Sequence, residues 1–516
     1  MLALLAGVLQ AASLAWPVAM PQLFHGLGLA QGQALWWGQT LALGVLVHLL
    51  LKSSSPRRAA WLGWLFATAW LACTFGWLFT SMHTYGGLAA PLAVLAVLAL
   101  AALLALYYAG SAWCFKALAL VNKAQIAIYF VALWVLAELA RGLLLSGFGW
   151  GAVGYAQVDG PLAPALPWLG LYGTSALAAL LAVLLALMLR ARSWRAVLQA
   201  ALAMAALLGL VQVLPAPQGT FTGTLSVTLL QGNIPQNEKF DQTSGVPNAL
   251  RWYGEQLNAS RTSLVISPET ALALLPEQLP PGYWQALQQR FATGAQAALV
   301  GMPLGDYDTG YTNSVVGLKP GQTAPWRYDK HHLVPFGEFI PPLFRWFTNL
   351  MNIPLGDFNR GALVQPTFDW QGQRLATTIC YENLFSEELA AQFTDVTKAP
   401  TMLVNLSNLG WFGEYLAMDQ HLHIARLRAL EFDRPFLLST NTGRTAVVDH
   451  LGRVTHALPN HVAQALQAEV QGRAGITPYA WWASRWGQWP VAVLAFFVVI
   501  FVWGFGGRHH KQPGSF

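Results

Sequence analysis

Charged residues and cysteines are scarce in this sequence of 516 residues. Asp, Glu, Lys and Arg make up 10% of the chain and hydrophobic residues 55%, whereas ordinary soluble domains carry about 25% charged residues. This composition excludes an intrinsically disordered chain and argues against a wholly soluble one. The three cysteines exclude a disulfide-rich scaffold. Cys73 and Cys114 lie in or beside the long apolar stretches of residues 1–214, and Cys380 alone lies in residues 215–483, so its own domain offers it no disulfide partner.

The net charge of +6 is unevenly distributed along the chain. Residues 1–214 contain nine basic and two acidic residues, and the C-terminal tail adds Arg508 and Lys511. The intervening residues 215–507 hold 18 basic and 21 acidic residues, as in an ordinary globular domain. No basic patch with interleaved aromatic residues is present, so we expect no nucleic-acid partner.

Eight stretches are apolar and close in length to a membrane-spanning helix, which needs about 20 residues. The first lacks the basic residues that begin a signal peptide, because the first charged residue is Lys52, and we interpret it as a span. The eight stretches are 1–18, 33–51, 60–80, 88–108, 125–146, 164–189, 196–214 and 489–504.

Lys and Arg occur in alternate loops between these stretches, at 52–58, 116–123, 190–195 and 508–511. Short loops rich in them stay in the cytoplasm, so both termini are predicted to be cytoplasmic. The sequence therefore predicts a transmembrane domain of seven helices at 1–214 and an outer domain at 215–483. A last helix and a cytoplasmic tail follow at 484–516.

Short β-rich runs alternate with helical periodicity in the outer domain, which is typical of an α/β layered fold. Helices are predicted at 247–258, 283–293 and 419–432. Strands are predicted at 225–230, 264–267, 298–301, 313–316, 376–380, 402–406, 436–440 and 445–449.

Three reactive residues occur where predicted strands end or in a polar segment between strands. Glu269 and Cys380 each follow an apolar run, and strand ends are where α/β sheets assemble their sites. Lys330 lies in the polar segment 327–338. Taken singly, the cysteine favours inert burial and the polar segment an exposed loop.

Glu269, Lys330 within Lys-x-His-Leu-Val-Pro-Phe-Gly-Glu, and Cys380 within Cys-Tyr-Glu resemble the Glu-Lys-Cys triad of the nitrilase, or carbon-nitrogen hydrolase, superfamily. Together with the eight apolar stretches, the chain resembles the membrane-embedded apolipoprotein N-acyltransferase family over nearly its whole length. Further matching strings lie at 138–141, 154–161, 231–236, 405–408, 411–413, 420–421, 425–431, 434–435 and 439–443.

A few positions depart from the family pattern without touching the triad. Phe240 stands where the family often has Trp, Leu409 and Gly410 replace an Asp-Ala pair, and Leu438 replaces an Arg. Their effect on lipid or acceptor contacts stays open.

The resemblance implies a nitrilase-like α-β-β-α sandwich joined to about eight transmembrane helices. In this interpretation Cys380 is the nucleophile, Glu269 the general base, and Lys330 the cation that eases thiolate formation and holds the oxyanion. Glu338, Tyr381 and Glu382 are candidates for supporting the triad or positioning substrate, with a purely structural role as the alternative.

The implied reaction moves an acyl chain from a membrane phospholipid to the α-amino group of a lipoprotein's N-terminal S-diacylglyceryl-cysteine. It passes through a Cys380 thioester in ping-pong order and releases a lysophospholipid. The implied location is the bacterial inner membrane, with the catalytic domain in the periplasm. We expect a monomer with no cofactor. We also expect no metal, because no cysteine or carboxylate recurs at zinc-ligand spacing from His331, His332, His421 and His423.

Two other functions use the same residues differently. A membrane-tethered amidase or nitrilase-type hydrolase resolves the thioester with water, and a non-catalytic scaffold or transporter does not use Cys380. The apolar segment 341–355 is either an arm that dips into the bilayer or a core helix. Glu138 and Arg141 are expected to form an i,i+3 ion pair, with a lipid headgroup contact as the alternative.

Overall fold

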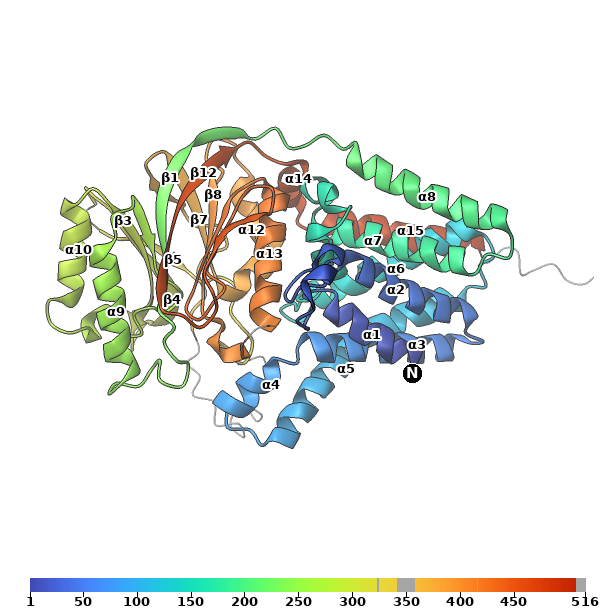
Figure 1. Cartoon of the computed structure of the whole chain (residues 1–516), viewed down its shortest axis with the longest axis horizontal. Helices are drawn as coiled ribbons and strands as arrows, with labels where there is room; N and C mark the ends of the chain where they lie inside the picture. The colour runs from blue at the N-terminus through green and yellow to red at the C-terminus, as the bar shows by residue number, and fades with distance from the viewer. Residues whose placement is uncertain (323, 341–357, 415, 507–516) are drawn as a thin grey trace, which may run out of the picture. The chain divides into compact units, whose positions relative to one another are not determined.

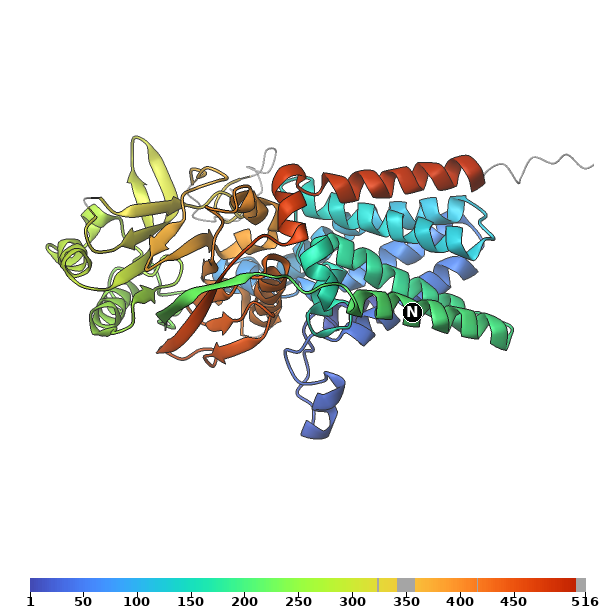
Figure 2. The ribbon, with the colours of Figure 1, turned by 90° about the horizontal axis from the view of Figure 1, so that it is seen from above.

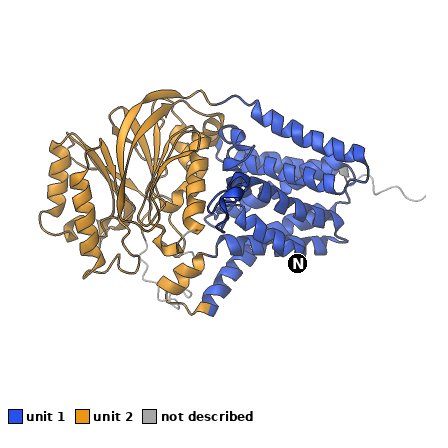
Figure 3. Ribbon diagram, in the orientation of Figure 1, with its two compact units in different colours: residues 1–76, 91–216, 486–516 blue, residues 77–90, 217–485 orange. Residues whose placement is uncertain are grey.

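The computed structural model describes residues 1–322, 324–340, 358–414 and 416–506. These residues form two compact units (Figure 3). The helical unit comprises residues 1–76, 91–216 and 486–516, and the sheet unit comprises residues 77–90 and 217–485. The apolar segment 341–355 lies outside the described residues.

The helical unit is built from long apolar helices that pack side by side (Figures 1 and 2). Within it α1 packs on α3, α2 on α7, and α6 on both α7 and α15. The helices of this unit are α1 (Leu2–Ala12), α2 (Trp36–Lys52), α3 (Pro56–Thr74), α5 (Ala90–Ala117), α6 (Lys123–Leu143), α7 (Leu166–Leu189), α8 (Trp194–Gln212) and α15 (Trp489–Gly506).

Four helices of the described residues are long and apolar enough to cross a membrane, and six if two bent pairs each count as one span. The eight predicted spans are therefore not all matched by helices of sufficient length. Helix α1 has 11 residues instead of the predicted 18, because the chain leaves the helix at Ser13. At 1.5 Å per residue, 11 residues extend about 16 Å, which is roughly half a hydrocarbon core.

Glu138 and Arg141 on α6 bind main-chain groups and not each other, in contrast to the expected ion pair. Glu138 Oε1 accepts a hydrogen bond of 2.9 Å from the N–H of Val153. Arg141 Nη1 donates to the carbonyl oxygens of Phe148 and Trp150 at 2.6 and 2.7 Å. Both side chains thus pair with main-chain polar groups of the loop that follows α6. Leaving such groups unpaired in an apolar setting would be costly.

The sheet unit contains two six-stranded sheets among its described residues, with strand orders β12-β1-β2-β3-β4-β5 and β11-β10-β9-β8-β7-β6. In each sheet a central parallel trio, β1-β2-β3 or β7-β8-β9, is flanked by antiparallel strands. The strands are β1 (Thr220–Gln231), β2 (Leu264–Ile266), β3 (Ala297–Asp306), β4 (Gly310–Leu318), β5 (Trp326–Asp329), β6 (Phe368–Trp370), β7 (Gln373–Ile379), β8 (Met402–Ser407), β9 (Phe436–Thr440), β10 (Ala446–Val448), β11 (Val454–Ala457) and β12 (Gln464–Ala474).

The two sheets pack face to face and helices cover their outer faces (Figure 1). Apolar side chains of both parallel trios fill the space between the sheets. Helices α9 (Gly245–Ala259) and α10 (Tyr283–Thr293) cover the first sheet, and α12 (Ser386–Ala390), α13 (Leu416–Phe432) and α14 (Pro478–Trp486) cover the second. The predicted α-β-β-α sandwich is confirmed.

Residues 77–90, which connect α3 to α5, belong to the sheet unit. They contain α4 (Leu78–Thr80) and the π-helical turn η2 (Ser81–Tyr85). Trp77 packs on Phe412 with ring centroids 4.5 Å apart, and its Nε1 donates to Gln420 Oε1 at 3.2 Å. These contacts explain why residues 77–90, which the sequence divided between the ends of two predicted spans and the loop that joins them, fold with the sandwich.

Candidate active site

The three residues of the expected triad follow the ends of three strands. Glu269 lies three residues beyond β2, while Lys330 directly follows β5 and Cys380 directly follows β7. Lys330 Nζ lies 3.4 Å from Glu269 Oε1. The charges of Glu269 and Lys330 shift the pKa of the Cys380 thiol in opposite directions, so both groups are close to it. The structure therefore brings Glu269, Lys330 and Cys380 together in one buried cluster.

Cys380 has a main-chain conformation that residues other than glycine rarely adopt. Its φ is +52°, at the point where β7 ends and the 3₁₀ turn η6 (Cys380–Leu384) begins. Asn405 Nδ2 donates to the carbonyl oxygen of Cys380 at 3.1 Å, so a side chain from the neighbouring strand β8 holds this turn. Such conformations persist where surrounding contacts fix them, and they cluster at functional sites.

The Cys380 thiol is protonated at neutral pH in this environment. Burial raises its pKa most, and the carboxylates of Glu269 and Glu338 raise it further. The Lys330 ammonium and the main-chain N–H of Asn408 lower the pKa without outweighing these effects. The effect of the Lys330 ammonium on the thiol pKa is thus outweighed by burial and by two carboxylates. A reaction at Cys380 therefore needs a base that removes the proton as the new bond forms.

Two carboxylates share the donors of this cluster. Lys330 Nζ lies 2.8 Å from Glu338 Oε1, closer than it lies to Glu269. Asn313 Nδ2 donates to Oε1 of both glutamates at 2.8 Å. The remaining oxygens accept main-chain N–H groups, Glu269 Oε2 from Asn408 at 2.9 Å and Glu338 Oε2 from Val334 at 2.8 Å. Every carboxylate oxygen therefore has a donor, which fixes the direction of both side chains.

The main chain of Lys330 is held from both sides. Its N–H donates to the carbonyl oxygen of Asn313 at 2.9 Å, and its carbonyl oxygen accepts from the N–H of Gly361 at 2.9 Å. Burial alone would lower the pKa of Lys330, but Glu338, Glu269 and Cys380 together raise it above the usual range. Lys330 therefore stays a cation at neutral pH.

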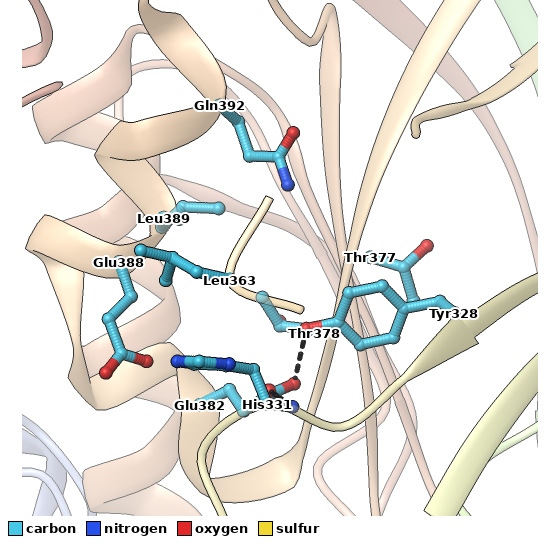
Figure 4. Close-up of a pocket in the computed structure, with 9 residues that line it drawn as sticks. All are labelled: Tyr328, His331, Leu363, Thr377, Thr378, Glu382, Glu388, Leu389 and Gln392. Carbon is cyan, nitrogen blue, oxygen red and sulfur yellow. Dashed lines mark hydrogen bonds between the residues drawn. The ribbon is translucent and has the colours of Figure 1, made fainter. Parts of the chain in front are cut away.

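Glu382 links the turn at Cys380 to the segment that follows Lys330. Its Oε2 accepts from the N–H of Ile379 at 2.6 Å and from the hydroxyl of Tyr328 at 2.9 Å. Its Oε1 accepts from the N–H groups of His331 and His332 at 2.6 and 3.1 Å. Glu382 also lines a small pocket with Tyr328 and His331 (Figure 4). Burial raises the pKa of Glu382.

Tyr381 and the predicted histidines occupy packing or hydrogen-bonding positions in this region. Tyr381 is buried and meets the Phe385 ring edge to face, at 5.2 Å between centroids. The His332 ring stacks on the same Phe385 ring, and His332 Nδ1 lies 2.8 Å from Glu388 Oε1. His421 Nε2 lies 3.0 Å from Asn383 Nδ2, and burial lowers the pKa of His421 to about 4. His421 is therefore neutral at physiological pH.

The departures from the family pattern fall in two kinds of environment. Leu409 and Leu438 are buried in the sandwich, where apolar residues pack without strain. Phe240 is 56% exposed on the loop after β1. Gly410 lies beside the side chain of Gln236, and Gln236 belongs to the same loop as Phe240.

Sequence reasoning missed four polar residues of the cluster: Asn313, Lys239, Asn405 and Asn408. Asn405 and Asn408 lie in a string used for the resemblance, and Asn313 opens a predicted strand. Lys239 precedes Phe240 in the loop after β1. The available signal was a polar residue near the end of a buried strand. This signal does not show which residues from distant strands its side chain contacts.

Two facing sheets with a glutamate, a lysine and a cysteine at their strand ends define a carbon-nitrogen hydrolase domain. The family model described as "Carbon-nitrogen hydrolase" matches residues 226–479, and that described as "Apolipoprotein N-acyltransferase N-terminal domain" matches residues 15–184. Among solved structures, the chain is similar to Saccharomyces cerevisiae Nit3, a member of branch 10 of the nitrilase superfamily. The TM-score is 0.37 and the identity 15%, over 50% of this chain and 93% of that chain.

Relatives of known name match almost the whole chain. The apolipoprotein N-acyltransferase of Verminephrobacter eiseniae is 53% identical over 94% of this chain and 92% of its own length. That of Ralstonia nicotianae is 43% identical over 89% of this chain and 88% of its own length. The chain belongs to the apolipoprotein N-acyltransferase family. Its relatives are bacterial and its described residues contain four to six candidate spans, so it is a bacterial membrane protein.

Proposed function

We propose that this protein transfers an acyl chain from a membrane phospholipid to the α-amino group of the N-terminal S-diacylglyceryl-cysteine of lipoproteins. The observation that carries the proposal is the buried cluster in which a protonated thiol, Cys380, lies with Glu269 and Lys330 at the strand ends. Membership of the apolipoprotein N-acyltransferase family supports a lipoprotein as the acceptor and a phospholipid as the donor.

In the first half-reaction Glu269 removes the thiol proton while the Cys380 sulfur attacks the ester carbonyl of the phospholipid. Lys330, held at 2.8 Å by Glu338, and a main-chain N–H stabilise the oxyanion of the tetrahedral intermediate. Glu269 then returns the proton to the departing glycerol oxygen, so the products are a Cys380 thioester and a lysophospholipid. Loss of an oxyanion donor such as Lys330 costs about a hundredfold or more in rate.

In the second half-reaction the neutral α-amino group attacks the thioester carbonyl. Glu269 takes a proton from the attacking nitrogen and gives it to the departing sulfur, which restores the Cys380 thiol. The two half-reactions share one base and one oxyanion site, and the lysophospholipid leaves before the acceptor reacts. The kinetics are therefore ping-pong.

The protein acts in the bacterial inner membrane as a monomer, with its transmembrane helices within residues 1–214 and 484–516 and with residues 215–483 in the periplasm. The distribution of Lys and Arg supports this orientation, since the loops at 52–58, 116–123 and 190–195 all lie on one side of the predicted topology. Both termini are cytoplasmic. Glu338, Tyr381 and Glu382 support the triad through the contacts described above.

The test uses purified protein in detergent with phospholipid labelled in one acyl chain and a diacylglyceryl-cysteine peptide. The expected products are N-acylated peptide and lysophospholipid, and the Cys380→Ala variant forms neither. Labelled free fatty acid without N-acylated peptide would identify a hydrolase. Full biological function of Cys380→Ala in cells would instead support the non-catalytic scaffold or transporter.

A further inference from the structure

A second lysine lies beside the proposed catalytic cluster. Lys239 belongs to the loop after β1 and is 4% exposed. Its Nζ donates to the main-chain carbonyl oxygen of Glu269 at 3.1 Å. The described residues place no carboxylate within ion-pair distance of it, so this buried ammonium has a carbonyl as its hydrogen-bond partner and no counter-ion in contact. Buried lysines are usually paired, and this one calls for another source of compensation.

The compensation comes from the charges of the cluster as a whole. Glu269 and Glu338 are the two carboxylates in contact with Lys330, so Lys330 by itself neutralises one of two negative charges. Burial lowers the pKa of Lys239 to about 8, while Glu269 and Cys380 act to keep it charged. Lys239 is thus close enough to both residues to respond to their charge.

We propose that Lys239 is a second active-site cation, whose positive charge balances the second carboxylate of the cluster and makes the Cys380 thiolate accessible during acyl transfer. The proposal rests on the proposed role of Cys380 as nucleophile. With both lysines charged, the cluster of Glu269, Glu338, Lys330 and Lys239 is neutral before reaction. It stays neutral when the thiol proton moves to Glu269, because the charge only changes place from oxygen to sulfur.

Without Lys239, the same proton transfer places a thiolate in a buried site that already carries an excess negative charge. A nearby opposite charge shifts a pKa by about 1–3 units, and each unit changes an equilibrium about tenfold. We therefore expect removal of the Lys239 charge to slow thioester formation at neutral pH by about tenfold or more.

Two substitutions separate the charge of Lys239 from its hydrogen bond. Lys239→Gln keeps an N–H donor for the carbonyl oxygen of Glu269 but removes the charge, whereas Lys239→Arg keeps both. Lys319→Gln is the matched control. Lys319 also donates to a main-chain carbonyl, that of Asp369 at 2.7 Å, but it is only half-buried and its contacts are with residues outside the cluster.

The readout is the rate at which the Cys380 peptide reacts with iodoacetamide between pH 6 and 10, followed by peptide mass spectrometry on the full-length protein. Thioester formation from phospholipid is measured alongside. For Lys239→Gln we expect the alkylation profile of Cys380 to move to higher pH. Lys239→Arg should follow the unsubstituted protein below pH 8, where both side chains are charged, and Lys319→Gln should follow it at every pH. The rate difference is largest below pH 8 and shrinks above it, because the unsubstituted lysine then loses its own charge.

Two results would overturn the role of Lys239. One is a Lys239→Gln protein whose alkylation profile and thioester rate equal those of the unsubstituted protein. The other is an equal loss in Lys239→Gln and Lys239→Arg with an unmoved profile, since that pattern identifies a packing role. Absence of any acyl adduct on Cys380 in the unsubstituted protein would overturn the proposed function itself, and is thus distinguishable.

Discussion

Replacing Asn313 with alanine removes the neutral donor that bridges the two carboxylates of the cluster. Its Nδ2 lies 2.8 Å from Oε1 of both Glu269 and Glu338, whereas Lys330 Nζ lies 3.4 Å from Glu269 Oε1. The amide is therefore the nearer of the two donors to this oxygen of the proposed base. A hydrogen bond to a charged group contributes about 1.5–3 kcal/mol, and 1.36 kcal/mol corresponds to tenfold in rate. If the loss falls on the orientation of Glu269, thioester formation slows by about tenfold to a hundredfold.

The assay is the time course of the acyl adduct on Cys380, followed by intact mass after mixing Asn313→Ala with phospholipid. Thr312→Ala is the control on the same strand, because Thr312 bonds to Ser314 and Leu304 instead of the carboxylates. Asn313→Asp is expected to be slower than Asn313→Ala, since it adds a third carboxylate to the pair. Thioester formation at the unsubstituted rate in a folded Asn313→Ala protein would refute the reasoning.

Two further predictions concern the thiol and the position of the base. Because burial, Glu269 and Glu338 raise the pKa of Cys380, its reaction with iodoacetamide should keep accelerating above the pH at which an ordinary cysteine levels off; a plateau at or below that pH would contradict this. Gly301→Ala should displace Glu269, because a methyl group there would clash with the carbonyl oxygen of Pro268 and lie 3.0 Å from Glu269 Cα. We expect about 1–3 kcal/mol of lost stability in thermal unfolding and at least tenfold slower acyl transfer, whereas Gly110→Ala, which meets open space, should change neither.

Much of the sandwich could be predicted because its central strands are continuous apolar runs. All eight predicted strands are present, and the helix predicted at 283–293 has the observed bounds. Strands β5, β6, β11 and β12 were missed for physical reasons. The residues of β11 are all exposed, and β12 alternates the buried Leu466, Ala468 and Val470 with exposed polar residues, so neither strand is a continuous apolar run. These strands are held by pairing with their neighbours, which a local pattern does not contain.

The sequence predicted which residues form the triad, but not the environment that surrounds them. Glu269, Lys330 and Cys380 were recognised from their strings, and the structure puts them in one cluster. The elevated pKa of the Cys380 thiol could not be predicted, because it depends on how deeply the turn is buried and on Glu338, which arrives from another segment. Asn313 escaped notice for a similar reason, since its two partners lie 44 and 25 residues away along the chain.

The same limit applies to the membrane region. Composition correctly predicted apolar helices, but where each helix ends depends on local capping and packing, as at Ser13 after α1. The loop contacts of Glu138 and Arg141 also depend on how the chain returns after α6. An i,i+3 spacing on a helix makes an ion pair possible, but nearby main-chain groups compete for both side chains.

The central claim is that Cys380 carries the acyl chain between donor and acceptor. The most direct test is the intact mass of the purified full-length protein after incubation with a single phospholipid species, before and after addition of a diacylglyceryl-cysteine peptide. We predict one acyl adduct, located on the Cys380 peptide, that disappears as N-acylated peptide forms. N-acylated peptide formed by a protein that never carries an adduct, or by Cys380→Ala, would contradict the account.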